Sequence, residues 1–357
     1  MQDESSRLQS ESESESEFHR SQLSMARAPG IHRRIDGLHR RVAMLLALYV
    51  VGLLVWVAAV DALFIWLTGT KPLATGNFWM VAILLSMVLG ATAYQWWRLS
   101  RDGGEVARLL GGTPVSRDPA DPKLRRLRQV LDEMAIAAAM PAPELFVLSS
   151  ELAINAFAAG INRQRSAIAV SQGTLDRLSR SELQAVVAHE LAHIRHGDTL
   201  VSMRLCAMNF GLMALTLLGV ALMSAGSVAA RQRSKDGQNA GAVLFLGGLA
   251  TAICGGVGWT IARVIEAATS RDQELRADAQ AVRWMGETGG MVGVLTKLAE
   301  EQRLIPPASL LGDSASLYRG LYLRDGARAG WFDSHPPLLQ RIKALDPQAL
   351  FDLEWRR

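Results

Sequence analysis

Cysteine is almost absent from this chain, with 2 among 357 residues. Cys206 and Cys254 both lie inside apolar runs, which excludes a framework of extracellular disulfides. We also expect no cleavable signal peptide, because residues 1–24 are acidic and Ser-rich and the first apolar run is too long for a signal core. The net charge of +4 is not gathered into one basic patch interleaved with aromatic residues, so we expect no nucleic-acid partner.

Apolar residues, in contrast, are abundant and concentrated. They make up 49% of the chain although 20% is charged, and they form four runs, at 42–67, 78–97, 205–230 and 240–262. A helix of about 20 apolar residues crosses a bilayer. Buried helices of a large soluble core would need polar faces that these runs lack. The pattern therefore predicts an α-helical multi-pass membrane protein with four transmembrane helices.

Basic residues flank these runs unevenly. One lysine, Lys71, lies in the first short connection, whereas arginines cluster before the first run and after the second, at Arg27, Arg33, Arg34, Arg40, Arg41, Arg98, Arg101 and Arg108. This bias predicts that the N-terminus, residues 98–204 and residues 263–357 face the cytoplasm, with Thr68–Asn77 on the opposite side. Arg231, Arg233 and Lys235, in the connection between the last two runs, weaken the bias.

Five segments follow from these runs. We expect residues 1–41 to form a disordered tail, acidic and then basic, in which Met25 is an alternative start. Residues 42–97 hold the first two spans and 205–262 the other two. Residues 98–204 and 263–357 form one small α+β domain, split by the third and fourth spans. Five glycines of the fourth span predict close helix contact: Gly247, Gly248, Gly255, Gly256 and Gly258.

The soluble segments carry clear helix and strand signals. Asp121-Pro122 predicts the start of a helix that ends by Pro141, and Ser179 with Glu182 forms a capping-box pattern before a helix at 181–196, which Gly197 ends. A further helical stretch is expected at 270–285, before a Gly/Pro-rich region that begins at Gly286. Strands are expected at 144–148, 152–158 and 166–171, the last two as a hairpin.

The sequence His189-Glu190-Leu191-Ala192-His193 lies on one of these predicted helices. The i, i+4 spacing puts both imidazoles on one face, where they can bind a single Zn²⁺, and Glu190 points toward the same cleft. His196, one turn further on, is better explained as a histidine at the helix C-terminus. This motif also arises by chance, so its context has to support the zinc interpretation.

A second helical motif supplies that context. Glu274 and Asp278 lie four residues apart, hence on one face. Glu274 completes a His₂Glu ligand set for one zinc ion per chain, and Asp278 can accept the second ring N–H of a ligand histidine. Taken alone, an acidic pair at this spacing is usually a solvated helix face.

These motifs, in this order, resemble the HtpX-like membrane metallopeptidases, whose family also contains the CAAX prenyl-protein endopeptidases. The resemblance rests on Asn155-Ala156-Phe157-Ala158 with Gly160, the HExxH helix with Gly197-Asp198, Arg271–Asp278, and His335-Pro336-Pro337 with Arg341. Leu275 departs from the pattern, since the family commonly has an aromatic residue there. The resemblance implies a zincin domain of the gluzincin type in the cell (inner) membrane.

The resemblance also implies roles for residues that spacing alone does not assign. Zinc would polarise the scissile carbonyl and acidify its water, and Glu190 would take the proton. His335 and Arg341 would act as catalytic donors near the developing oxyanion. Asn155, Ala156, Phe157 and Ala158 would bind an extended polypeptide as an added strand.

The expected partners are polypeptide substrates and the lipid bilayer. Misfolded or damaged membrane proteins are the substrates that the resemblance implies, whereas the motifs alone give peptide-bond hydrolysis beside a membrane. Two alternatives stay open: a dedicated processing protease of the CAAX-endopeptidase type, and a catalytically silent zinc-bearing membrane scaffold. The sequence does not give the oligomeric state.

Overall fold

The computed structural model describes residues 75–231, 235–304 and 336–349, together with scattered positions between 47 and 69. The chain divides into two units, Met1–Val55 and Trp56–Arg357. In the first unit the described positions, between 47 and 55, are helical. Most of the predicted tail and much of the first predicted span therefore lie outside the described residues.

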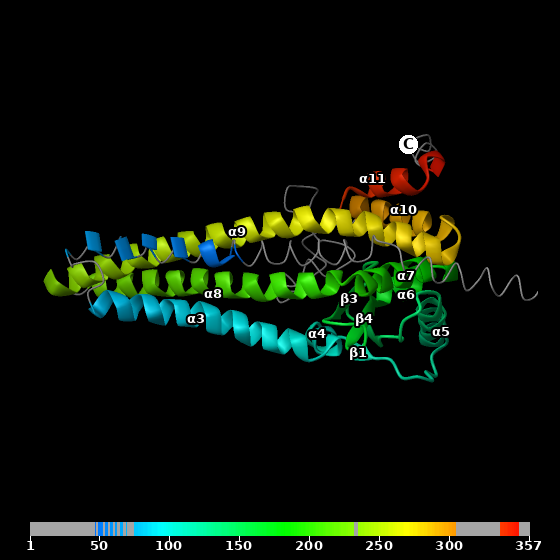
Figure 1. The fold of residues 1–357 in the computed structure, drawn as a ribbon, viewed down its shortest axis with the longest axis horizontal. Helices are drawn as coiled ribbons and strands as arrows, with labels where there is room; N and C mark the ends of the chain where they lie inside the picture. The colour runs from blue at the N-terminus through cyan, green and yellow to red at the C-terminus, as the bar shows by residue number, and fades with distance from the viewer. Residues whose placement is uncertain are drawn as a thin grey trace, which may run out of the picture. The chain divides into compact units, whose positions relative to one another are not determined.

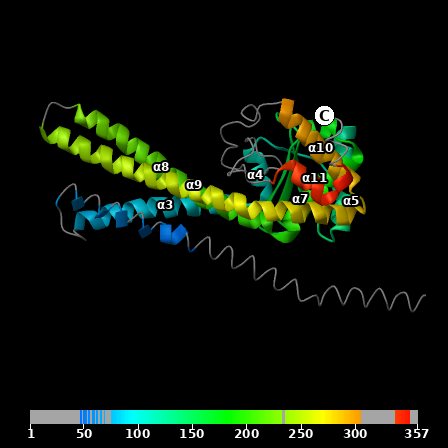
Figure 2. The same ribbon diagram turned by 90° about the horizontal axis from the view of Figure 1, so that it is seen from above.

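Long helices dominate the second unit (Figure 1). The second predicted span lies in α3 (Thr75–Arg101), the third in α8 (Asp198–Ala230) and the fourth in α9 (Lys235–Met285). α8 packs along α9, and α3 packs against α8, as two perpendicular views show (Figure 2). The helix predicted at 270–285 is not separate, because α9 runs without a break from the fourth apolar run to Met285.

Glycine allows α8 and α9 to approach closely. A Cβ atom on Gly219 of α8 would lie 2.3 Å from the backbone nitrogen of Ala252, and one on Gly248 of α9 would lie 2.6 Å from that of Met223. These distances leave no space for a side chain. Of the five glycines predicted to make helix contacts, Gly248, Gly255 and Gly258 face α8, whereas Gly247 and Gly256 have nothing within 4 Å.

Two helices of the described part of the chain, Asp198–Ala230 and Ala240–Arg263, are long and apolar enough to cross a membrane. α3 is not one of them by this measure, although it exposes Trp79, Ile83 and Trp97. The observed protein is thus mostly helical, with a small sheet and two candidate membrane helices. The predicted count of four spans stays a prediction.

The sheet has four strands in the order β1-β2-β4-β3. β2 (Glu144–Leu148) and β4 (Ser166–Ser171) have the predicted bounds and run parallel, whereas β3 (Ala156–Gly160) begins later than predicted. β3 and β4 form the predicted antiparallel hairpin. β1 (Thr113–Pro114) pairs with β2 and was not predicted.

Both faces of the sheet are covered, so β3, β4 and all of β2 except its first residue are buried. Along β2, Leu145 and Val147 join a core with residues of α5 (Pro122–Ala137), α7 (Arg180–His196) and α10 (Gly289–Leu304). Phe146 and Leu148 join a second core with residues of α3, α4 (Gly103–Leu109) and α8. The period of two in a strand directs alternate residues to the two cores. One face of the sheet therefore supports α7, and the other contacts the long helices.

Of the shorter helices, α5 was predicted from the sequence and α10 was not. α5 (Pro122–Ala137) begins at the predicted cap, where the Asp121 carboxylate accepts a hydrogen bond from the Lys123 amide at 2.8 Å. α10 (Gly289–Leu304) lies in the Gly/Pro-rich region that begins at Gly286, and it was not predicted. The remaining helices are α4 (Gly103–Leu109), α6 (Gln172–Arg177), α7 (Arg180–His196) and α11 (Leu338–Leu345).

Candidate metal centre

Helix α7 presents the HExxH sequence in the interior. Its start is fixed by the predicted capping box, in which the Ser179 amide donates to Glu182 at 2.7 Å and the Glu182 amide donates to the Ser179 hydroxyl at 3.3 Å. Gly197 ends the helix in the left-handed conformation, with φ of 78°. His189 and Glu190 on this helix are 0% and 2% exposed. Two polar side chains at this depth need partners.

The three predicted ligands come together. Nε2 of His189 lies 3.1 Å from Nε2 of His193. The Glu274 carboxylate, which α9 brings against α7, lies 3.3 Å from Nε2 of His193 and 3.5 Å from Nε2 of His189. Potential ligand atoms of all three residues lie within 4.8 Å of one another. Tertiary packing thus joins the two sequence motifs at one point.

The outer ring nitrogens show why a cation fits here. Nδ1 of His189 faces the Asp278 carboxylate at 2.9 Å, and Nδ1 of His193 faces the Asp198 carboxylate at 3.1 Å. If each Nδ1 carries the proton and donates it to its carboxylate, both Nε2 atoms are left as acceptors. Two nitrogen lone pairs and a carboxylate then converge, which is favourable only around a positive charge.

The spacing of these atoms fits zinc. Zinc bonds to nitrogen and oxygen ligands are about 2.0–2.2 Å long, so tetrahedral ligand atoms lie roughly 3.3–3.6 Å apart. The two Nε2 atoms lie 3.1 Å apart, and the two oxygens of Glu274 lie 3.3 Å from Nε2 of His193 and 3.5 Å from Nε2 of His189, so each histidine faces a different oxygen of one carboxylate. The residues present therefore fit a small tetrahedral metal ion with one position left for another ligand.

In the metal-free protein, protons on the two histidines balance the negative charge of the neighbouring carboxylates. Burial lowers the pKa of His189, but the charge of Glu274 and a hydrogen bond to Asp278 outweigh it and raise that pKa above its usual value. Burial also lowers the pKa of His193, and hydrogen bonds to Asp198 and Glu274 more than compensate, so that its pKa lies well above the usual value. The metal-free site therefore favours a bound proton where the metal would be.

Arg341 of α11 holds the acidic side of the centre. It is 0% exposed, and its Nε and Nη2 atoms donate to the two oxygens of Asp278 at 2.7 and 2.6 Å. Its Nη1 lies 2.9 Å from Glu274. Burial raises the pKa of Asp278, but the Arg341 charge outweighs burial and holds that pKa below its usual value. This geometry favours a positioning role for Arg341, while the predicted oxyanion role stays a prediction.

The predicted substrate strand lies at an edge of the sheet. Asn155 directly precedes β3, and its backbone N–H donates to the hydroxyls of Ser171 and Thr174 at 3.0 and 2.9 Å. Among the described strands β3 pairs only with β4, so its other edge has no strand neighbour. Ala156, Phe157 and Ala158 are nevertheless 0–3% exposed. A peptide can therefore add to this edge only if the covering groups move.

Two other histidines considered in the sequence, His335 and His196, are not in the ligand group found among the described residues. His335 lies outside the described residues, so its predicted role stays a prediction; the description resumes at Pro336, just before α11. His196 is partly buried and is not part of the ligand group. Burial lowers its pKa below the usual value.

Asp198 was not assigned a role from the sequence. It is the first residue of α8, and it reaches His193 because the left-handed Gly197 folds the start of α8 back toward the end of α7. The available signal was an acidic residue five positions after the second histidine, directly after a helix-ending glycine. That signal is weak, because acidic residues commonly begin helices.

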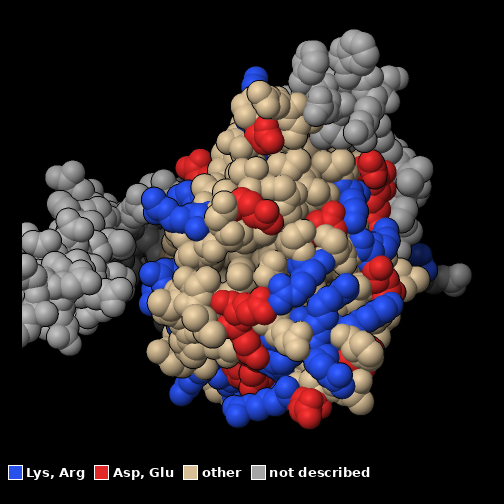
Figure 3. Space-filling model, turned by 90° about the vertical axis from the view of Figure 1, so that its right-hand side faces the viewer, with Lys and Arg blue, Asp and Glu red and all other residues tan. Residues whose placement is uncertain are grey.

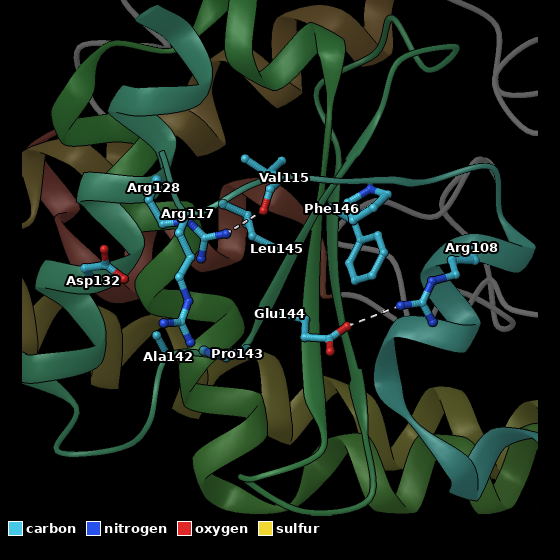
Figure 4. Close-up of a pocket in the computed structure, with 11 residues that line it drawn as sticks. Arg108, Val115, Arg117, Arg128, Asp132, Ala142, Pro143, Glu144, Leu145 and Phe146 are labelled. Carbon is cyan, nitrogen blue, oxygen red and sulfur yellow. Dashed lines mark hydrogen bonds and ion pairs between the residues drawn. The ribbon is translucent and has the colours of Figure 1, made fainter. Parts of the chain in front are cut away.

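A pocket of about 630 Å³ lies between α4, α5 and β2, and none of the residues of the metal centre line it (Figure 4). Arg108 and Glu144 form an ion pair at 3.6 Å there, and Arg128 donates to the Val115 carbonyl at 2.7 Å. The molecular face in Figure 3 likewise carries Lys and Arg side chains interspersed with Asp and Glu. Neither the pocket nor this face has a single sign of charge.

Comparison with known proteins agrees with the geometry. Residues 122–349 match the profile of Peptidase family M48. A "Protease HtpX homolog" of Ligilactobacillus salivarius is 29% identical over 287 residues, covering 79% of this chain and 93% of that protein. Another "Protease HtpX homolog", from Caldanaerobacter subterraneus subsp. tengcongensis, is 32% identical over 270 residues, covering 75% and 85%.

A solved structure is also similar. The "Crystal Structure of S. mikatae Ste24p" is 17% identical, covers 81% of this chain and 62% of that one, and has a TM-score of 0.40. The match to the family profile includes all the described residues that form the metal centre, from α7 to α11.

Proposed function

The chain belongs to peptidase family M48, and from that premise we propose that it is a membrane zinc endopeptidase with the metal held by His189, His193 and Glu274. The observation that carries the proposal is the convergence of two Nε2 atoms and one carboxylate at 3.1–3.5 Å. A donor set of two imidazoles and one carboxylate, with an open position, is typical of catalytic zinc. The buried acidic partners of both imidazoles support the same assignment.

When bound, zinc supplies a Lewis acid for the scissile carbonyl and lowers the pKa of a water molecule in the open position. Glu190 adjoins His189 on α7 and is buried, and its charge acts on Arg341. We assign Glu190 as the general base that takes the proton of the attacking water. The water oxygen bonds to the carbonyl carbon, the C–N bond breaks, and Glu190 passes the proton to the leaving amine.

The remaining catalytic groups are proposals of the same kind. His335 would donate to the oxyanion that develops on the carbonyl oxygen, a role that rests on the family resemblance. Asn155 and Ala156–Ala158 would bind the substrate backbone along the edge of β3, which the single strand neighbour of β3 supports. Arg341 would keep Asp278 and Glu274 in place, which its contacts with both carboxylates support.

We further propose four spans, with the catalytic domain on the cytoplasmic side and split by α8 and the first part of α9. The two apolar helices, and the position of the HExxH and Glu274 motifs on either side of them, support this arrangement. Misfolded or damaged membrane proteins are the proposed substrates. Glu144→Cys offers a check, because labelling of that thiol by an impermeant reagent from outside intact cells would contradict the orientation.

The decisive experiment combines metal analysis with proteolysis of an unfolded model substrate such as casein. The wild type should hold one zinc per chain and lose activity on chelation. Glu190→Gln should keep its zinc and lose proteolysis, because an amide cannot accept the proton. Glu133→Gln, an exposed change on α5, is the matched control and should keep both.

The outcomes separate the alternatives. Unchanged turnover by Glu190→Gln would reject the mechanism, and a zinc-free wild type would reject the metal assignment. A zinc-loaded wild type that cleaves neither casein nor a membrane-protein substrate would favour the silent scaffold. Cleavage restricted to a prenylated peptide would favour the dedicated processing enzyme.

A further inference from the structure

The two ligand histidines are oriented by carboxylates from different helices. Asp278 of α9 faces Nδ1 of His189 at 2.9 Å, and Asp198 of α8 faces Nδ1 of His193 at 3.1 Å. Asp278 belongs to the motif that also supplies Glu274. Asp198 instead lies at the start of one of the two helices long enough to cross a membrane.

The position of Asp198 keeps its carboxylate available to His193. It is 3% exposed, and its second oxygen lies 3.9 Å from a guanidinium nitrogen of Arg276. The N-cap of α8 is Gly197, which has no side chain, and Asp198 is the first residue of the helix. The positive end of the helix dipole favours a charged carboxylate at this position.

We propose that Asp198 is a positioning residue that fixes the tautomer and ring orientation of His193 for metal binding. An acceptor at Nδ1 keeps the ring proton there and leaves the lone pair of Nε2 directed at the site shared with His189 and Glu274. This inference rests on the proposed function, because it assumes that His193 is a metal ligand. It makes the geometry of the centre depend on where α8 begins.

Removing this acceptor lets the neutral imidazole adopt the other tautomer, in which Nε2 carries the proton and cannot bind the metal. Asp198→Ala should therefore weaken zinc binding by about 10- to 100-fold, the range for groups that orient a metal ligand. Asp198→Asn should recover part of that loss, because its amide oxygen still accepts from Nδ1. Asp272→Ala, an exposed change on α9, is the matched control and should bind zinc like the wild type.

The test measures zinc affinity by competition with a chromophoric chelator, the visible spectrum of the Co²⁺-substituted protein, and the Tm of the metal-free protein. We expect weaker zinc binding and a shifted Co²⁺ spectrum in Asp198→Ala, and any fall in its metal-free Tm should be partly recovered by Asp198→Asn. Zinc affinity equal to that of the wild type would overturn the proposal. A large fall in the metal-free Tm, without recovery by Asp198→Asn, would assign Asp198 to folding and also overturn it.

These measurements need no substrate, so they separate this inference from the proposed function. A wild type that binds no zinc would defeat the metal centre itself. A wild type that binds zinc as tightly as Asp198→Ala would leave the centre standing and remove only the positioning role.

Discussion

Arg341→Met removes the guanidinium that contacts the proposed ligand Glu274 and its neighbour Asp278, while keeping most of the side-chain volume. In the wild type this guanidinium donates to both oxygens of Asp278 at 2.7 and 2.6 Å and lies 2.9 Å from Glu274. Asp278 is 1% exposed and Glu274 is 3% exposed, so water cannot replace it. The substitution leaves two neighbouring carboxylates buried without their cation.

The expected cost follows from that burial. Removing one partner of a buried ion pair destabilises a protein by about 3–5 kcal/mol, mainly because a charge remains buried and uncompensated. One kcal/mol lowers Tm by about 2–4 °C in a domain of this size class, which gives a fall of roughly 6–20 °C in the metal-free protein. A bound divalent cation compensates the same carboxylates, so we expect a smaller fall in the zinc-loaded protein.

Thermal unfolding of the purified protein, with and without zinc, tests this reasoning. Arg276→Met is the control, because Arg276 is 49% exposed and lies 3.9 Å from Asp198, a pair worth about 1 kcal/mol or less. A metal-free Tm of Arg341→Met within 2 °C of the control would refute the role assigned to the buried pair. An equal fall with and without zinc would refute the compensation by the metal.

Three further predictions concern other parts of the chain. Hydrogen bonds from Lys297 and from the Ser179 cap outweigh burial and hold the pKa of Glu182 below its usual value. The ionised carboxylate therefore stabilises the folded protein above about pH 4, and this stabilisation is lost as pH falls through the folded-state pKa. Glu182→Gln should therefore lower stability by about 1 kcal/mol at pH 7 and flatten the acid limb of a Tm-against-pH curve; an unchanged limb would contradict this. Gly219→Ala should cost about 1–3 kcal/mol, because its Cβ would lie 2.3 Å from the backbone of α9, whereas Gly247→Ala should be near neutral in the same unfolding assay. His335→Phe should lower kcat by about 10²- to 10³-fold with normal zinc content, and zinc loss would show that His335 is a ligand or a structural residue.

Local patterns predicted the parts of the centre that depend on neighbours in sequence. The capping box of Ser179 and Glu182, the helix that it begins and the end of that helix at Gly197 all agree with the structure. The bounds of β2 and β4 also agree, because short apolar runs bounded by turns specify buried strands directly. The i, i+4 spacing of His189 and His193 needs only helical geometry to bring their rings together.

Other features depend on contacts that local patterns do not report. α10 was not predicted; it forms although it begins with Gly289 and Gly290, because Met291, Val294 and Leu298 join the core beside α7. α9 continues from the apolar run through the Glu274 motif, since the polar segment after Arg263 contains no Gly or Pro that would end a helix.

The residue types of the candidate centre and their helical spacing are local properties of the chain, so they could be predicted without a structure. Which carboxylate faces which ring nitrogen depends on tertiary packing. Asp198 meets His193 through the turn at Gly197, and Arg341 meets Asp278 because α11 packs against α9. Packing and burial bring these helices together, and the spacing of residues along the chain does not predict which side chains then meet.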